Sequence, residues 1–323
     1  MSIVQIILIA VAAAAALLLL AVAWQVARTR LIAAEAERNV PPIGTFIDVD
    51  RNRLHHIDQG EGAPLLFIHG LGAQLYQFHG PLFPAMGEGF RLVAVDRPGS
   101  GYSVRAPGAG GTLKEQALVM RRFIEAKGLG KPLVVGHSLG TAVALALALD
   151  HPEAVAGLAL ISAHTHHADA VPPGFEGLNL VSPLKRRLVA ETVAVPASQK
   201  YAAQTLAYLF APQAPPADYM TAGGGWLGLR PSHFYATATD FVDARRDHPG
   251  YLARLAELKM PVGILFGTAD KVLDYERHGL AMRDRIAGLD LELLDGVGHM
   301  PQFADPARVA AFVKRMAAKT FPG

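Results

Sequence analysis

The sequence predicts an α/β domain with a mostly parallel twisted sheet and helices on both faces, together with an inserted helical cap and an N-terminal transmembrane helix. Three observations lead to this fold class. Short apolar strands alternate with amphipathic helices over most of the chain, the alternation breaks once in the middle, and an uncharged apolar run stands at the start. Such alternation is typical of a parallel sheet covered by helices.

The composition limits the functions that need to be considered. The chain has 323 residues, 51% of them hydrophobic, which is enough for one large core with an inserted subdomain. Lys and Arg number 30 against 28 Asp and Glu, so no field of one sign favours nucleic acid as a partner. Cysteine is absent, which excludes disulfides, thiol catalysis and cysteine-based metal sites. Nothing in the composition indicates an oligomeric state.

The N-terminal segment over residues 1–26 is expected to be an uncleaved membrane anchor. Residues 3–24 carry no charge and would span about 33 Å as a helix, close to the roughly 30 Å of a bilayer core. A cleaved signal peptide is the alternative, because Ala21-Val22-Ala23 resembles a cleavage site. Against it, no Lys or Arg precedes the apolar run, and the run is longer than a usual signal core.

The residues after the anchor set its expected orientation. Arg28 and Arg30 follow the apolar run, whereas only the terminal amine precedes it, so the positive-inside rule favours a single-pass protein with a cytoplasmic catalytic domain. Residues 27–44 read as a linker that continues as an alanine-rich helix. Asn39 and Pro41-Pro42 are expected to stop that helix.

The remaining chain divides into a core in two parts, 45–163 and 248–323, and a cap at 164–247 that is rich in Pro and Gly. The core is predicted to contain strands at 46–57 (a hairpin turning near Asp50-Arg51-Asn52), 64–68, 91–95, 132–135, 155–161, 261–266 and 289–294, and helices at 113–127, 139–149, 251–258, 275–286 and 306–318. The cap is predicted to contain helices at 184–194 and 198–210 and no clear strand.

The candidate nucleophile is Ser138 in Gly136-His137-Ser138-Leu139-Gly140, between a predicted strand and an apolar helix. A strand-to-helix turn this tight forces a strained backbone at the serine, and Gly136 and Gly140 remove side chains that would collide there. The serine oxygen then projects above the sheet, at the positive end of the following helix. The alternative is an ordinary glycine-rich turn whose serine caps the helix.

A serine needs a base to take its proton, and that base needs a carboxylate to orient it. His299 follows the last predicted strand and is the expected base, and Asp270 follows the strand before it and is the expected acid. Both stand at carboxyl ends of parallel strands, where open α/β sheets place their sites. The rival acids are Asp274, Asp295 and Asp169.

Two backbone N–H groups are expected to hold the oxyanion. One is that of Leu139, directly after the nucleophile. The other is that of Leu71, in the loop His69-Gly70-Leu71-Gly72 after the first central strand, where Gly70 keeps the backbone open. The other reading of this loop is a plain glycine-rich connection.

Two further groups of residues admit a functional and a structural reading. His164, His166 and His167 have a spacing that can bind a metal, but a polar hinge loop beside the cap is the preferred interpretation, and no metal is expected. The basic runs Lys185-Arg186-Arg187 and Arg245-Arg246 usually mark solvated surface. Beside an anchor they can instead contact anionic lipid.

Taken together, these motifs resemble the α/β-hydrolase superfamily, in its capped, esterase-like serine hydrolase branch, over about residues 45–320 apart from the cap. The resemblance includes Asp96-Arg97-Pro98-Gly99-Ser100-Gly101-Tyr102-Ser103, which looks like the D-x-x-G-x-G-x-S turn of the capped branch. That branch includes carboxylesterases, carbon–carbon bond hydrolases, haloperoxidase-like enzymes, epoxide hydrolases and haloalkane dehalogenases. The last two use an aspartate nucleophile, so Ser138 disfavours them.

The resulting expectation is a membrane-anchored carboxylesterase that needs no cofactor and acts on a lipophilic small-molecule ester. A carbon–carbon bond hydrolase or an acyl-transfer enzyme would use the same three side chains. A non-catalytic binding module tethered to a membrane is the remaining alternative, but a decayed enzyme usually lacks a catalytic residue or an oxyanion glycine, and none is missing here.

Overall fold

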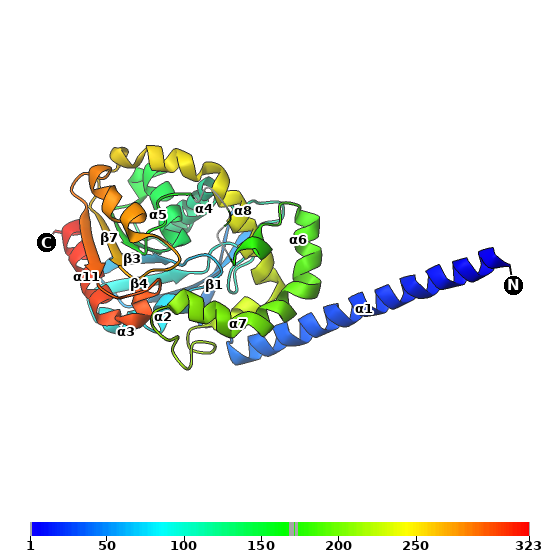
Figure 1. Ribbon diagram of the computed structural model, residues 1–323. Helices are drawn as coiled ribbons and strands as arrows, with labels where there is room; N and C mark the ends of the chain where they lie inside the picture. Colours follow the sequence, from blue (N-terminus) through cyan, green and yellow to red (C-terminus); the bar gives the residue numbers. More distant parts are fainter. Residues whose placement is uncertain (1, 168–170, 172–173, 323) are drawn as a thin grey trace.

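A computed structural model describes residues 2–167, 171 and 174–322. Its centre is an eight-stranded sheet in the order β1-β2-β4-β3-β5-β6-β7-β8, antiparallel at β1 and β2 and parallel from β4 to β8 (Figure 1). The predicted α/β fold with a mostly parallel sheet is confirmed. The strands are β1 (Thr45–Val49), β2 (Asn52–Gln59), β3 (Ala63–Ile68), β4 (Phe90–Val95), β5 (Leu133–His137), β6 (Gly157–Ile161), β7 (Val262–Gly267) and β8 (Asp290–Leu294).

The alternating side chains of the central strands supply two cores, one on each face of the sheet. Leu66 of β3 and Val134 of β5 belong to one core, and their neighbours Leu65 and Val135 belong to the other. The first core lies under α4 (Leu113–Ala126) and α5 (Leu139–Asp150), and the second under α2 (Tyr76–His79), α3 (Phe83–Met86) and α11 (Pro306–Thr320). Because both faces are covered, the strands read as continuous apolar runs.

The cap connects β6 to β7, and its described part contains helices, turns and an irregular stretch at 211–224 but no strand. It contains α6 (Pro183–Val189), the π-helical turn η3 (Ala190–Ala194), α7 (Val195–Phe210), α8 (Pro231–Ala253), and the 3₁₀ turns η2 (Glu176–Leu178), η4 (Gly225–Leu229) and η5 (Leu255–Glu257). The predicted separate helix at 251–258 is wrong, because α8 runs on through residue 247 to Ala253. Pro249-Gly250 favours a break there, but the burial of Tyr251 against the core carries the helix onward.

The end of the chain also departs from the prediction in one place. The helix expected at 275–286 is instead α9 (Tyr275–His278) and the 3₁₀ turn η6 (Leu280–Asp284), separated by Gly279. Glycine is a poor helix former, and the backbone turns there. A further short helix, α10 (Pro301–Ala304), follows β8.

Helix α1 (Ile3–Asn39) projects from the body as a single rod (Figure 1). Its apolar half is fully exposed and is long and apolar enough to cross a membrane, a test that signal sequences also pass. Its second half packs against the cap through Thr29, Ile32 and Ala36, which are buried. The segment predicted as a linker at 27–44 is therefore helical up to Asn39 and is fixed to the body by side-chain packing.

Candidate active site

The turn between β5 and α5 holds Ser138 in a strained conformation, with φ 50° and ψ −123°. A side chain on either flanking glycine would collide with backbone. A Cβ on Gly140 would lie 2.1 Å from the carbonyl oxygen of Ile68, and one on Gly136 would lie 2.8 Å from the Cα of Thr141. The glycines of the motif are therefore required by the close approach of the loop after β3 and of the turn's own backbone.

Three side chains predicted from separate strand ends lie within hydrogen-bond distance of one another. The Nε2 of His299 is 3.1 Å from the Oγ of Ser138, and its Nδ1 is 2.8 Å from an oxygen of Asp270. The side chains of His299 and Asp270 are 5% and 0% exposed. The arrangement excludes water from the carboxylate while leaving the half-buried serine open to a cavity.

Asp270 is held in its ionised form. Burial raises the pKa of its carboxyl, but the neighbouring His299 and the N–H groups of Val272 and Leu273, which donate at 2.8 and 2.9 Å, outweigh burial and leave the pKa below its usual value. These bonds also fix the carboxylate in direction, so it can orient the imidazole.

Neither described rival acid contacts the Nδ1 of His299, although Asp274 lines the same cavity. Asp274 accepts the N–H of Glu276 at the start of α9, and Asp295 accepts the hydroxyl of Thr268. Asp169 lies outside the described residues.

The backbone of His299 is positioned by two buried side chains. Its carbonyl oxygen accepts the Nε2–H of His137 at 2.8 Å and the hydroxyl of Ser162 at 3.2 Å. The amide of Gln77 donates to the other ring nitrogen of His137. Burial lowers the pKa of His137 to about 3, so this ring stays neutral and shapes the site, as its place in a tight glycine turn indicates.

The two N–H groups expected to bind an oxyanion lie at the same cavity as Ser138. Leu139 is the first residue of α5, so its N–H has no partner within the helix. Leu71 follows Gly70 in the loop after β3, and both leucines line the cavity with Ser138 and His299. A Cβ on Gly70 would lie 3.1 Å from the Cβ of Ser138, which shows how closely this loop approaches the nucleophile.

Arg97 holds that loop in place, a role that the sequence did not reveal. Its guanidinium is fully buried and donates to the carbonyl oxygens of His69 and Gly70 at 3.0 and 2.8 Å. It also pairs at 2.5 Å with Asp240 of the cap helix α8, which Arg105 contacts as well. Arg97 stands in the D-x-x-G-x-G-x-S turn, but its partner is 143 residues away, a distance that no local spacing encodes.

The cavity at Ser138 measures about 340 Å³ and lies between the core and the cap. The cap contributes the apolar side chains of Phe175, Leu209 and Phe241. Besides that of His299, the imidazoles come from the loop after β6, from α8 and from α9. Burial lowers the pKa of His248 to about 4 and that of His278 to about 3, so these imidazoles are neutral at pH 7. Charged residues also line the cavity, namely Asp240, Arg245, Asp274 and Arg277, so the pocket suits a largely apolar group that carries a polar part.

The histidine loop after β6 and the basic runs take different places from those expected of simple surface. His164, His166 and His167 line the cavity, and among the described residues no group of three or more His, Asp or Glu is arranged to hold a metal ion. Arg186 is buried and donates to Thr239, and Arg245 lines the cavity. The interpretation as solvated surface is therefore wrong for Arg186, whereas Lys185, Arg187 and Arg246 are exposed.

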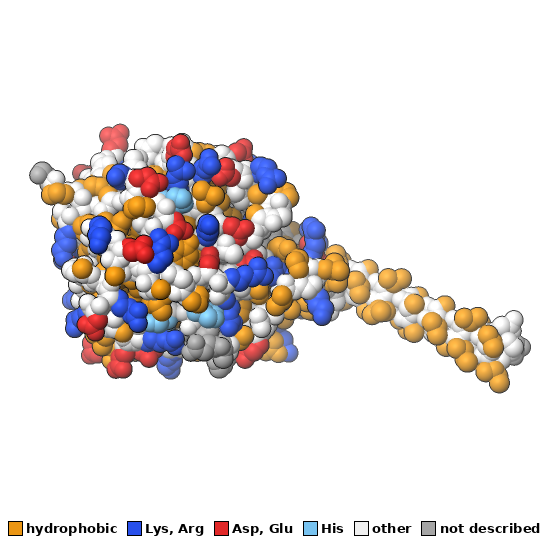
Figure 2. All heavy atoms as spheres, turned by 90° about the horizontal axis from the view of Figure 1, so that it is seen from above, with side chains coloured by type: hydrophobic (Ala, Val, Ile, Leu, Met, Phe, Trp, Pro, Cys, Tyr) orange, Lys and Arg blue, Asp and Glu red, His pale blue; other side chains and the backbone are white. Residues whose placement is uncertain are grey.

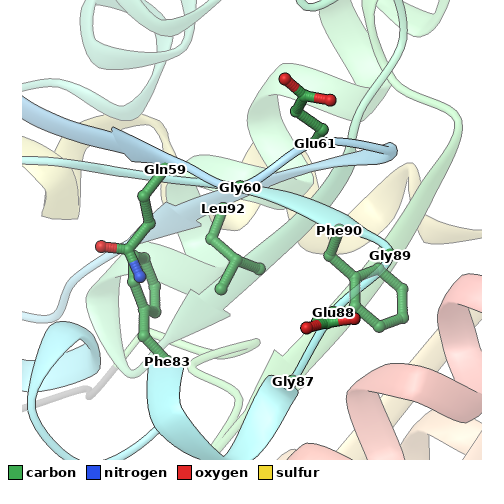
Figure 3. A pocket seen from close by; sticks show the side chains of 9 residues that line it. All are labelled: Gln59, Gly60, Glu61, Phe83, Gly87, Glu88, Gly89, Phe90 and Leu92. Atoms are coloured by element: carbon green, nitrogen blue, oxygen red, sulfur yellow. The ribbon is translucent and has the colours of Figure 1, made fainter.

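A second cavity of about 350 Å³ lies at the opposite edge of the sheet, where β3 and β4 begin (Figure 3). None of the residues that line it is a serine or a histidine, so no nucleophile and base meet there. They are Gln59, Gly60, Glu61, Phe83, Gly87, Glu88, Gly89, Phe90 and Leu92. The cavity at Ser138 is the candidate active site.

Comparison with known proteins adds independent findings. The family model described as alpha/beta hydrolase fold matches residues 63–306. A 2-hydroxy-6-oxononadienedioate/2-hydroxy-6-oxononatrienedioate hydrolase of Burkholderia vietnamiensis is 27% identical, over 81% of this chain and 91% of that enzyme. The acetyltransferase component of an acetoin cleaving system of Cupriavidus necator is 41% identical, but over 40% of this chain and only 34% of its own length. The crystal structure of a bacterial membrane phospholipase A superposes with a TM-score of 0.65, 23% identity and 99% coverage of both chains.

Proposed function

Because the chain belongs to the α/β-hydrolase family and is a hydrolase of that fold, we propose that it cleaves a carboxylic ester through Ser138 and is held at a membrane by α1. The observation that carries the proposal is the continuous chain of contacts from Ser138 through His299 to Asp270, at 3.1 and 2.8 Å. This is the geometry that activates a serine hydroxyl as a nucleophile.

In the first half of the reaction, Ser138 Oγ attacks the ester carbonyl while the Nε2 of His299 takes its proton. The carbonyl oxygen becomes an oxyanion, which the N–H groups of Leu139 and Leu71 stabilise. His299 then gives the proton to the leaving alcohol, and an acyl-enzyme remains on Ser138. Asp270 holds the imidazole in the required tautomer and stabilises its cation.

In the second half, water replaces the alcohol. His299 takes a proton from water as the oxygen attacks the acyl-enzyme, and it returns that proton to Ser138 Oγ when the acid leaves. The apolar cap residues Phe175, Leu209 and Phe241 displace water from part of the cavity, which strengthens the oxyanion contacts. Side chains supply every proton transfer, so the proposed reaction needs no cofactor.

The substrate is proposed to be a lipophilic small-molecule ester. Phe175, Leu209 and Phe241 form an apolar wall beside Ser138, which suits an acyl chain. Helix α1 would hold the enzyme where such substrates partition. The likeness to the membrane phospholipase A supports the proposal of a lipophilic ester substrate. This likeness extends over α1, because 99% of both chains superpose.

A second candidate function is hydrolysis of a carbon–carbon bond in a diketone-like substrate. Its support is the relative from Burkholderia vietnamiensis, which is matched over 91% of its own length. The same three side chains would serve. Comparing a short p-nitrophenyl ester with a ring-fission-type substrate on one preparation separates the two functions, because the preferred bond gives the larger kcat/KM.

Replacing the nucleophile tests the proposal. We expect Ser138→Ala to lower turnover of a short p-nitrophenyl ester by about 10⁴-fold or more, because no other group can form the acyl-enzyme. Ser232→Ala, at an exposed serine of α8, is the matched control and should leave turnover unchanged.

A fluorophosphonate probe should label the wild-type chain and not Ser138→Ala, since only an activated serine reacts readily. Unlabelled wild-type protein would indicate a non-catalytic binding module, and full turnover by Ser138→Ala would overturn the assignment.

A further inference from the structure

Four large apolar side chains stand exposed on one part of the cap. Val181, Leu184, Leu188 and Val193 are 65%, 69%, 57% and 51% exposed. We call them the α6 face, since they lie along α6 and the turns that flank it. Exposed large aliphatic side chains that are close together in one short segment are a candidate interaction surface.

The α6 face is built as the outer side of an amphipathic element. Leu184 and Leu188 are one helical turn apart and point away from the body, whereas Arg186 between them is buried. The guanidinium of Arg186 donates to the carbonyl oxygen of Leu180 at 2.8 Å and to the hydroxyl of Thr239 at 2.7 Å. These bonds fix α6 to α8, so the leucines cannot turn inward without breaking them.

The contacts of α1 place this face beside the apolar rod. The hydroxyl of Thr29 donates to the carbonyl oxygen of Thr192 at 2.8 Å, and Arg30 pairs with Glu191 at 2.6 Å. Both partners belong to η3, which directly follows α6. Farther along α1, Ile32 and Ala36 are buried in one cluster with Val195 and Leu229, so the rod cannot swing relative to the cap.

The depth of the contact matches the border of a bilayer. Thr29 follows Trp24, the end of the apolar run, by five residues, or about 7.5 Å along a helix. The polar layer on each side of a bilayer is about 5–8 Å thick. If residues 3–24 span the hydrocarbon core, η3 therefore lies at the headgroup layer. Helix α6 runs across the direction of α1 at this end of the molecule (Figure 1).

Charges around the α6 face suit anionic headgroups. Lys185 and Arg187 are exposed on α6 between the apolar side chains, and Arg28 is exposed on α1. Where α1 leaves the body, hydrophobic and basic side chains are intermixed (Figure 2). The acidic residue nearest the contact, Glu191, is already paired with Arg30. Apolar side chains flanked by Lys and Arg are the pattern of a helix that lies in the membrane interface.

We propose that the α6 face lies in the interface of the same bilayer that α1 crosses, as a second membrane contact made by the cap and favoured by anionic phospholipid. This inference rests on the membrane anchor of the proposed function. The chain runs on from α6 through η3 into α7, whose Leu209 lines the active-site cavity. The cap that covers Ser138 is thereby held against the layer in which a lipophilic ester dissolves.

The absence of cysteine allows a direct test on the full-length chain. Leu188→Cys, Leu17→Cys in the apolar run and Ala311→Cys on α11 are each labelled with bimane. Helix α11 lies at the opposite end of the molecule from α1 (Figure 1). Each protein is reconstituted into vesicles of phosphatidylcholine and phosphatidylglycerol that contain nitroxide lipids. We expect quenching at 188 by headgroup-region nitroxides, quenching at 17 by deeper ones, and none at 311.

The possible results separate the claims. Quenching at 17 without quenching at 188 overturns the α6 contact and leaves the anchor intact, and no quenching at 17 overturns both. A label at 188 that nitroxide lipids do not reach, and whose emission changes with the ratio of protein to lipid, would assign the face to a second copy of the chain and overturn the proposal. Fluorophosphonate labelling of the same preparations reports on Ser138 independently, so failure of the hydrolase assignment is recognised separately.

A second measurement links the contact to turnover. The double variant Leu184→Ser, Leu188→Ser should lose at least about fivefold in rate on a long-chain ester presented in vesicles, because the cap loses apolar contact with the interface. Its rate on a soluble short ester should stay within about twofold of wild type, because these residues are remote from the reacting groups. Leu118→Ser on α4, where the leucine is 38% exposed, is the matched control. Equal losses on both substrates would contradict the proposal.

Discussion

At the scale of single residues, the site depends on groups that do not themselves react. Ser138 can stand above the sheet only because Gly136 and Gly140 leave room for neighbouring backbone. The oxyanion loop keeps its place because Arg97 binds two of its carbonyl oxygens. Both effects are steric or electrostatic constraints on the backbone, so conservative substitutions at these positions should have large consequences.

The glycine after the nucleophile gives the sharpest steric prediction. Gly140→Ala would place a Cβ 2.1 Å from the carbonyl oxygen of Ile68, so the elbow or β3 must move. We expect a loss of about 100-fold or more in kcat/KM on a short ester, because a displacement of about 1 Å misaligns the nucleophile. Gly250→Ala, where a Cβ meets nothing within 4 Å, should leave kcat/KM unchanged. Similar kcat/KM values for the two variants would show that the close approach does not constrain the site.

The buried ion pair gives an electrostatic prediction. Asp240→Asn leaves the fully buried guanidinium of Arg97 without its carboxylate. Removing one partner of such a pair costs about 3–5 kcal/mol in the free energy of unfolding, and turnover should fall with the loosened oxyanion loop. Urea unfolding of the detergent-solubilised chain measures the first effect and kcat the second. Glu257→Gln, in the exposed pair with Arg254, should change stability by less than about 1 kcal/mol. An Asp240→Asn protein as stable as wild type would contradict the role of this pair.

At the scale of elements, the strands and the helices that follow them could be predicted because each has one dominant pattern. The buried strands are continuous apolar runs, and α4 is amphipathic with the capping box of Thr112 and Glu115 at its start. Ser138, Asp270 and His299 could be placed because all three follow strands whose carboxyl ends share an edge. The roles proposed for these three residues were predicted from their order along the chain and not from the local sequence pattern around each residue.

The cap and its contacts could not be predicted in the same way. The course of α8 past Pro249 depends on the burial of Tyr251, and the buried state of Arg186 depends on Thr239, which is 53 residues away. The docking of α1 depends on Thr29, Ile32 and Ala36, which fit a partner that local sequence does not identify. In each case tertiary packing overrides local propensity.

The docking of α1 can be tested with two alanines of the same helix. Ala36 is 0% exposed and packs against the cap, whereas Ala34 is exposed. Ala36→Leu should overpack the contact and destabilise it by about 1–3 kcal/mol, whereas Ala34→Leu should have little effect. Limited proteolysis in detergent measures this, with faster cleavage near residues 25–40 expected for Ala36→Leu only. Equal cleavage rates for the two variants would show that α1 is not fixed to the cap.

At the scale of the whole molecule, the buried histidines couple stability to pH. Burial lowers the pKa of His137 and His278 to about 3 and that of His233 and His248 to about 4, from an ordinary value of 6.5. Below pH 6.5 the unfolded chain binds protons at these rings that the folded chain does not bind. The stability of the fold therefore rises with pH in this window and is lost as the pH falls. Asp270, whose pKa is also lowered, adds a loss of the same sign at more acidic pH.

The resulting prediction is an asymmetric pH profile of stability. The free energy of unfolding should be nearly constant from pH 8 to pH 7 and should fall steadily from pH 6.5 to pH 4.5, by up to about 1.4 kcal/mol per pH unit for each histidine, and the urea midpoint should fall with it. Unfolding curves of the full chain in detergent at four pH values measure it. His248→Gln should reduce the dependence of the free energy of unfolding on pH by the contribution of His248, because glutamine does not titrate. A midpoint that stays constant down to pH 4.5 would contradict the burial of these rings in their neutral form.

The central claim is that Ser138 forms an acyl-enzyme, and trapping that species tests it most directly. Wild-type protein is mixed with an excess of a short p-nitrophenyl ester, quenched in acid within the first turnovers and analysed by mass spectrometry of the intact chain and its peptides. The account predicts an added acyl group on the peptide that contains Ser138, together with a burst of p-nitrophenol. No acyl group on that peptide while the ester is turned over, or an acyl group on another residue that persists in Ser138→Ala, would contradict it.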